Sequence, residues 1–137
     1  LGAALGASLP APRRGDELWQ HTCFEVFVRQ PGSERYVELN FAPSGQWAAY
    51  RFAGYRSGRA DAEPEPLRLE TARADDSFEL CADYLLDLPA QAPWQLNLTT
   101  IIEEADGRKS YWALAHPPGK ADFHHDDGFV LNLPAIA

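Results

Sequence analysis

An alternation of apolar and polar side chains with a period of two constrains this chain more than any other feature. Residues 22–28, 36–41 and 47–52 alternate in this way, and the turn-forming runs Pro31-Gly32-Ser33 and Pro43-Ser44-Gly45 separate them. Because successive side chains of a strand point to opposite faces of a sheet, the pattern predicts three consecutive strands of an antiparallel meander.

The rest of the chain repeats the pattern in shorter pieces. Further strands are expected at 67–73, 77–82, 94–103, 110–116 and 128–133. The turn Ala105-Asp106-Gly107 is expected to join two of them as a hairpin, with a long exposed connection at 53–66 and a helical turn at 83–88. No periodic stretch is long enough for a substantial helix. The sequence therefore predicts an all-β protein, an antiparallel β-sandwich.

Composition limits the size and the partners of this fold. The 137 residues are enough for one domain, and the formal charge of -8 disfavours binding to nucleic acid or to an anionic membrane surface. The longest uncharged stretch, 88–102, contains two prolines and predicts no membrane span, and residues 1–12 lack the pattern of a signal peptide. Two cysteines leave the compartment undetermined. Methionine is absent, which suggests a fragment.

The alternation assigns the first three strands two different faces. One face is predicted to be the core and holds Phe24, Val26, Val28, Val37, Leu39, Phe41, Ala48, Tyr50 and Phe52. The other collects Trp19, His21, Cys23, Glu25, Tyr36, Glu38, Asn40, Trp47, Ala49 and Arg51. Aromatic rings stack on sugar rings and planar polar groups bind hydroxyls in pairs, so this second face suits a saccharide site. Two alternatives to a saccharide site remain for this face. Its polar residues could form a network that fixes strand register, or its carboxylates could be a pair for glycoside hydrolysis.

Several motifs carry a family resemblance. They are residues 18–25 (LWQHTCFE), 36–47, 50–52, 55–56, 110–114, 116–117 and 122–125 (DFHH). Together they resemble the bacterial DOMON-like domains related to family 9 carbohydrate-binding modules, over residues 18–133. The resemblance implies a ligand-binding β-sandwich at 18–137. Because the family begins with one or two strands before the LWQHTCFE segment, the first strands are expected to be missing, and 1–17 to be a remnant or a flexible segment.

The resemblance also implies roles for individual residues. The relatives hold a terminal sugar between two aromatic rings, with a carboxylate, an amide and an arginine on its hydroxyls. By position, Trp19 is the first ring, Glu25 the carboxylate and Arg51 or Arg56 the arginine, while Phe123 replaces the tryptophan that relatives use as the second ring. The ligand-binding residues predicted in all are Trp19, His21, Glu25, Glu38, Asn40, Trp47, Arg51, Arg56, Phe123, His124 and His125. Trp94 and Trp112 are expected in the core.

The predicted function is a non-catalytic module that binds a small molecule, a saccharide, without a cofactor. A haem or metal cofactor domain and a protein-interaction domain remain as alternatives. Haem ligation by methionine is impossible, which leaves a bis-histidine site drawn from His21, His116, His124 and His125. The His and Asp residues of 116–127 suit a divalent metal but lack regular ligand spacing, so we expect them to cap turns and line the ligand cleft.

Overall fold

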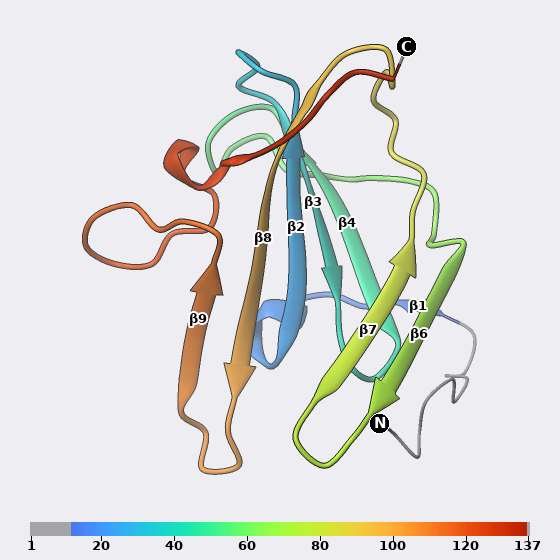
Figure 1. Ribbon diagram of the computed structural model, residues 1–137, viewed down its shortest axis with the longest axis vertical. Coiled ribbons are helices and arrows are strands. Elements are labelled where there is room, and N and C mark those ends of the chain that lie inside the picture. Colours follow the sequence, from blue (N-terminus) through green and yellow to red (C-terminus); the bar gives the residue numbers. More distant parts are fainter. Residues whose placement is uncertain (1–11, 137) are drawn as a thin grey trace.

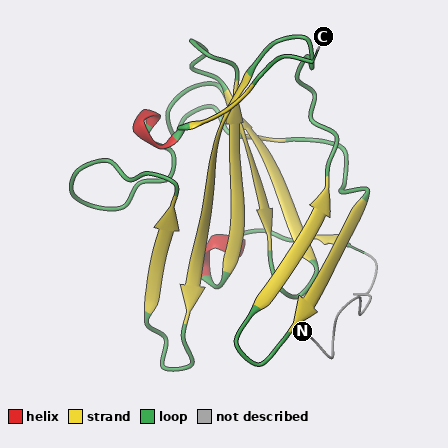
Figure 2. Ribbon diagram, in the orientation of Figure 1, coloured by secondary structure: helices red, strands yellow, loops and turns green. Residues whose placement is uncertain are grey.

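The computed structural model describes residues 12–136 and shows an all-β protein with two sheets (Figure 1). The strands are β1 (Arg13–Arg14), β2 (Cys23–Arg29), β3 (Tyr36–Phe41), β4 (Gln46–Phe52), β5 (Ala60–Asp61), β6 (Arg68–Arg73), β7 (Phe78–Asp83), β8 (Trp94–Glu103), β9 (Lys109–Ala113) and β10 (Leu131–Leu133). The described residues form no α-helix, only the 3₁₀ turns η1 (Leu18–Gln20) and η2 (Asp126–Gly128) (Figure 2). Within residues 12–136, no helix is long and apolar enough to cross a membrane.

The first sheet has eight strands in the order β1-β4-β3-β2-β8-β10, with β5 paired to β4 and β9 paired to β8. The second sheet is the β6–β7 hairpin. The arrangement is sandwich-like, and both sheets are open. The prediction of a purely antiparallel sheet is wrong in one place, because β1 pairs with β4 in parallel.

The predicted strands are confirmed with small shifts of their ends. The β2–β3–β4 meander and the β8–β9 hairpin pair as expected, and Gly107 supplies the positive φ that the hairpin turn requires. Two local predictions are wrong. The segment 53–66 contains the short strand β5, which pairs with β4, and residues 84–88 continue from β7 without a helical turn.

The assignment of β4 to the two faces is also wrong. Pro43-Ser44-Gly45 forms a three-residue turn, closed by a hydrogen bond from the Ala42 amide to the Gln46 carbonyl (2.9 Å), with Gly45 at a φ of 90°. This turn places Trp47 opposite Phe41 and Arg51 opposite Val37. Ala48, Tyr50 and Phe52 therefore share a face with Glu25 and Glu38, whereas Trp47, Ala49 and Arg51 do not.

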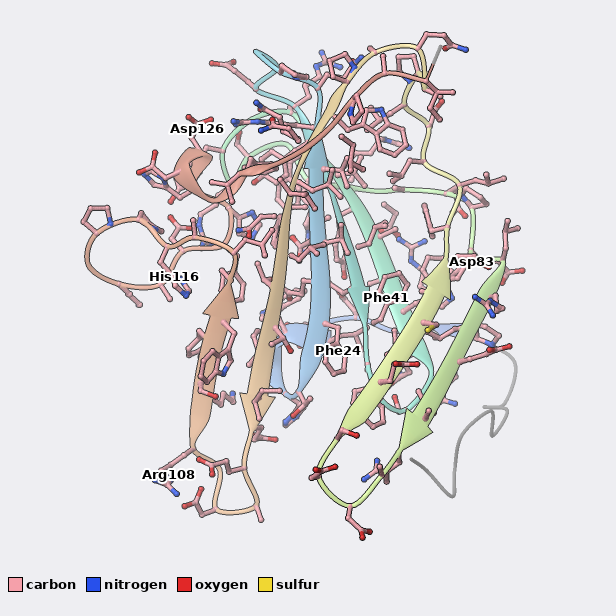
Figure 3. All side chains as sticks on the ribbon, viewed as in Figure 1. Phe24, Phe41, Asp83, Arg108, His116 and Asp126 are labelled. Atoms are coloured by element: carbon pink, nitrogen blue, oxygen red, sulfur yellow. The ribbon has the colours of Figure 1, made fainter. Side chains whose placement is uncertain are left out.

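We call the face that carries Glu25 and Glu38 the acidic face and the opposite face the aliphatic face. The aliphatic face packs against the β6–β7 hairpin, where the buried residues are Leu39, Phe41, Trp47, Ala49, Ala62 and Leu69. Figure 3 shows Phe24 and Phe41 between the first sheet and this hairpin. The acidic face is covered by η1 and by the 114–130 segment, which joins β9 to β10. Both faces are thus buried, and the core is not confined to one of them.

The second sheet covers only part of the aliphatic face. The hairpin packs over β2, β3 and β4, while β8 and β9 lie beside it (Figure 1). Strand β10 pairs with the first residues of β8. Leu98 and Trp112 are 41% and 60% exposed there, and Leu131 and Leu133 are exposed as well. The prediction that Trp112 packs in the core is therefore wrong.

The chain start is described from residue 12 onward, so residues 1–11 of the predicted segment 1–17 lie outside the described residues. Arg13 and Arg14 form β1. The Arg14 guanidinium donates hydrogen bonds to the carbonyl oxygens of Ala49 (2.6 Å) and Ala62 (3.0 Å) and lies 4.8 Å from the centre of the Trp47 ring. These contacts attach residues 13 and 14 to the edge of the first sheet.

Candidate binding cavity

A cavity of about 430 Å³ lies between the acidic face and the segments that cover it. Its lining combines aromatic rings, two carboxyls, an imidazole and two guanidinium groups. The lining residues are Trp19, Glu25, Glu38, Phe52, Arg56, Arg59, Ile101, Tyr111, Ala121, Phe123 and His124. The structure therefore brings together Trp19, Glu25, Glu38, Arg56, Phe123 and His124 from the predicted ligand-binding set.

Two buried carboxyls lie at the floor of the cavity. Glu25 of β2 and Glu38 of β3 are each 4% exposed. The Thr99 hydroxyl donates to Glu25 Oε1 over 3.3 Å, and Nε2 of His124 lies 3.5 Å from Glu38 Oε1. Burial raises the pKa of Glu25 to about 8 and that of Glu38 to about 7, and the negative charge of Glu38 adds to the rise at Glu25. The pair therefore tends to retain a proton at neutral pH.

A chain of hydrogen bonds fixes the orientation of His124. The backbone N–H of Arg56 donates to the Tyr36 hydroxyl oxygen over 3.1 Å, which leaves the hydroxyl proton free to donate to His124 Nδ1 over 2.7 Å. Burial lowers the pKa of His124 to about 4, so its ring is neutral at pH 7. We assign the single ring proton to Nε2, because Nδ1 accepts from Tyr36. The imidazole thus directs an N–H toward the Glu38 carboxyl.

Asp122 attaches the 114–130 segment to the opposite side of the cavity. Its Oδ1 accepts hydrogen bonds from the Arg56 guanidinium (2.9 Å) and from the His124 backbone N–H (3.2 Å), and its Oδ2 accepts from the Tyr55 hydroxyl. Burial alone would raise the pKa of Asp122, but the hydrogen bonds from Tyr55 and Arg56 outweigh it and hold this pKa below its usual value. An ionised carboxylate therefore holds the cover of the cavity in place.

Aromatic rings form the walls. Trp19 projects from η1 and packs edge-on against Tyr50 with their ring centres 6.3 Å apart. Phe123 is buried and lies 6.1 Å from the half-exposed ring of Tyr111. The Arg59 guanidinium lies 4.7 Å from the centre of the Tyr50 ring, and it has no carboxylate within 4 Å in the part of the chain that the structure describes.

Arg59, Tyr111 and Phe52 are cavity residues that the sequence analysis did not select. Tyr111 could have been found, because the predicted 105–107 turn fixes which residues of the following strand share a face with Ile101. Phe52 was missed because β4 was assigned to the faces in the wrong register. Arg59 gave no signal, since it lies in a connection without a repeating pattern.

The remaining predicted residues lie outside the cavity. Asn40 is opposite Glu25 in the sheet and fully buried, and neither polar atom of its amide has a hydrogen-bond partner among residues 12–136. His21 is exposed at the surface, with Nδ1 2.9 Å from a carboxylate oxygen of Glu103. Trp47 and Arg51 lie on the aliphatic face.

His125 lies at a second cavity, of about 810 Å³, which also touches His124 and Tyr36. Its Nδ1 accepts a hydrogen bond from the Asp127 backbone N–H over 3.0 Å and so caps η2. This is the capping role expected for a histidine of the 116–127 segment. Across the described residues, no three His, Cys, Asp or Glu side chains are grouped so that they could hold a metal ion.

Comparisons of the chain with protein-family models, with curated proteins and with solved structures find no match. The function of this chain must therefore be inferred from the cavity itself.

Proposed function

We propose that this chain is a non-catalytic ligand-binding domain and that the cavity over the acidic face binds a saccharide. The observation that carries the proposal is the pairing of aromatic walls, Trp19 and Tyr111, with a floor made by the carboxyls of Glu25 and Glu38. The motifs of the LWQHTCFE and DFHH segments support the same assignment, because they resemble DOMON-like domains related to family 9 carbohydrate-binding modules.

The chemistry of the lining suits a ring with hydroxyl groups. The apolar face of a pyranose can stack on Trp19, while Glu25 and Glu38 accept hydrogen bonds from its hydroxyls. Arg59, which lies beside the Trp19 ring, adds donors at the cavity wall. The volume of about 430 Å³ lies within the range of small-molecule sites, which runs from roughly 300 to 1,000 Å³.

The thiol on the acidic face supports a non-catalytic role. Cys23 is fully buried, and burial together with the neighbouring Glu25 carboxyl raises its pKa far above the ordinary thiol value. A thiol that stays protonated is a poor nucleophile. Nucleophilic chemistry at this thiol is therefore disfavoured, which agrees with a binding role for the acidic face.

Paired variants test the proposal. Trp19→Ala is compared with Trp112→Ala, which removes an exposed tryptophan from the aliphatic face, on the side of the sheet opposite the cavity lining. Loss of a stacking ring is expected to weaken sugar binding by about 1 to 3 kcal/mol in the first variant and to leave it unchanged in the second. Calorimetric titration with a panel of mono- and disaccharides measures the affinities, and thermal melts verify folding.

Two results would contradict the proposal. One is the absence of binding to every sugar of the panel by the wild-type protein. The other is an equal loss of affinity in Trp19→Ala and Trp112→Ala, since the cavity would then not be where the sugar binds.

A further inference from the structure

The floor of the cavity has more hydrogen-bond acceptors than donors. The Thr99 hydroxyl is already directed at Glu25, and the His124 Nε2 proton already faces Glu38. The Arg56 guanidinium is bound to Asp122. An ionised carboxylate accepts about four hydrogen bonds. A cation beside the pair favours its ionised form over the protonated one, so the two glutamates then keep most of their acceptor capacity for a cationic ligand. A ligand group that only donates fits this floor best.

No Arg or Lys of the described chain forms an ion pair with the two carboxyls, although the more distant charges of Arg59 and Arg56 partly offset the rise in the pKa of Glu38. His124 is the only basic side chain within 4 Å of either of them in residues 12–136, and its ring is neutral. Arg56 and Arg59 line the same cavity but make no ion pair with Glu25 or Glu38. Because two buried carboxylates without a cation are unfavourable, a bound cation would relieve their repulsion.

The walls and the whole protein favour a cation as well. Trp19 and Tyr111 are aromatic rings at the lining, and ring faces attract ammonium groups. The net charge of -8 raises the local concentration of cationic ligands. A metal ion is a poorer fit, because the described residues offer no third ligand beside the two carboxyls.

We propose that the saccharide is an amino sugar whose ammonium group binds between the carboxyls of Glu25 and Glu38. This inference rests on the proposed function and narrows it to one ligand class. An ammonium supplies three donors and no acceptor, which matches the acceptor-rich floor. The rest of the sugar ring then packs against Trp19 and Tyr111 at the walls.

Matched sugars test the inference. The wild-type protein is titrated with D-glucosamine, D-glucose and N-acetyl-D-glucosamine, and with the corresponding galactose series. Within each series the sugars differ only in the group at one carbon, and acetylation removes the charge while keeping the nitrogen. We expect the amino sugar of at least one series to bind about tenfold more tightly than its neutral counterparts.

Glu38→Gln and the control Glu79→Gln, an exposed glutamate of β7, complete the experiment. The first is expected to weaken binding of the amino sugar by a larger factor than binding of the neutral sugars, and so to abolish the preference, while the second preserves it. Neutral sugars that bind as tightly as amino sugars would overturn this inference and leave saccharide binding intact. Failure of both series to bind, while another sugar of the panel binds, would overturn this inference alone, whereas failure of every sugar would overturn saccharide binding itself. A preference that survives in Glu38→Gln would show that the ammonium lies elsewhere, and would also overturn the inference.

Discussion

Replacing Glu25 with glutamine is expected to stabilise the protein at mildly alkaline pH. The wild-type carboxyl is buried, and its pKa in the folded state is about 8 against an ordinary value of 4.5. The folded protein therefore binds a proton that the unfolded chain releases. The contribution of this proton to the free energy of unfolding is complete below pH 4.5 and is lost as the pH rises through the folded-state pKa of Glu25.

His124 acts with the opposite sign and limits the useful range of pH. Its pKa falls from 6.5 to about 4 on folding, so the unfolded chain binds the extra proton and stability rises with pH up to 6.5. Above 6.5 this effect ends, and the raised pKa values of Glu25 and Glu38 act alone. The carboxyl pair is therefore best measured between pH 6.5 and about 8.

The size of the effect follows from proton linkage. Each proton held only by the folded state changes the free energy of unfolding by about 1.4 kcal/mol per pH unit. For Glu25 this amounts to a loss of about 2 kcal/mol across the window, and Glu38 adds to the first part of it. Glu25→Gln keeps the shape of the side chain and its contact with Thr99 but binds no proton, so its stability is expected to fall much less.

Urea unfolding followed by tryptophan fluorescence, at a series of pH values, measures this difference. Glu79→Gln is the control, because Glu79 is exposed and its variant is expected to follow the wild type. A free energy of unfolding that does not fall between about pH 6.5 and pH 8 in the wild type would refute the reasoning. So would a Glu25→Gln variant that falls as steeply as the wild type.

Two further predictions concern the aliphatic face. Leu39→Ala is expected to lower the free energy of unfolding by about 2 to 5 kcal/mol, because Leu39 is 5% exposed beneath the β6–β7 hairpin. Leu98→Ala, at a site that is 41% exposed, is expected to lower it by about 1 kcal/mol or less. Urea unfolding measures both values, and equal losses in the two variants would contradict this prediction. The exposed part of the face and the unpaired edge of the hairpin are expected to make the protein self-associate, and Trp112→Lys to weaken this. Analytical ultracentrifugation measures the self-association, and a wild-type protein that stays monomeric as its concentration rises would be evidence against this prediction.

The strands could be predicted from the sequence because each has a period of two and is bounded by turn residues. The face assignment of β4 depended on a finer feature, the number of residues in the turn. The turn Pro43-Ser44-Gly45 has three residues. A turn of this length pairs Phe41 with Trp47 and not with Ala48. A one-residue error in register moves every side chain of the strand to the other face. Trp47 and Arg51 were placed beside Glu25 for that reason alone.

The cover of the acidic face could not be predicted in the same way. The 114–130 segment has no repeating pattern, and its position depends on the contacts of Asp122 with Arg56 and Tyr55, which are far away in the sequence. Such contacts are set by the fold and leave no local signal. His124 was selected from the density of histidine and aspartate in this segment, but its hydrogen bond with Tyr36 became apparent only in three dimensions.

Since both faces of the first sheet contain buried residues, burial alone does not distinguish the face proposed to bind a ligand from the opposite face. The distinction lies in what is buried. On the aliphatic face the buried side chains of β3, Leu39 and Phe41, are apolar. The acidic face instead buries Glu25, Glu38 and Asn40, and no Arg or Lys of residues 12–136 forms an ion pair with either carboxyl. Burying such groups destabilises the folded protein, and a protein with apolar residues of similar volume at these positions would often be more stable. The presence of the two carboxyls at a cavity floor, with pKa values raised by burial, is typical of functional sites, and it fits the proposal that a ligand supplies the missing partner.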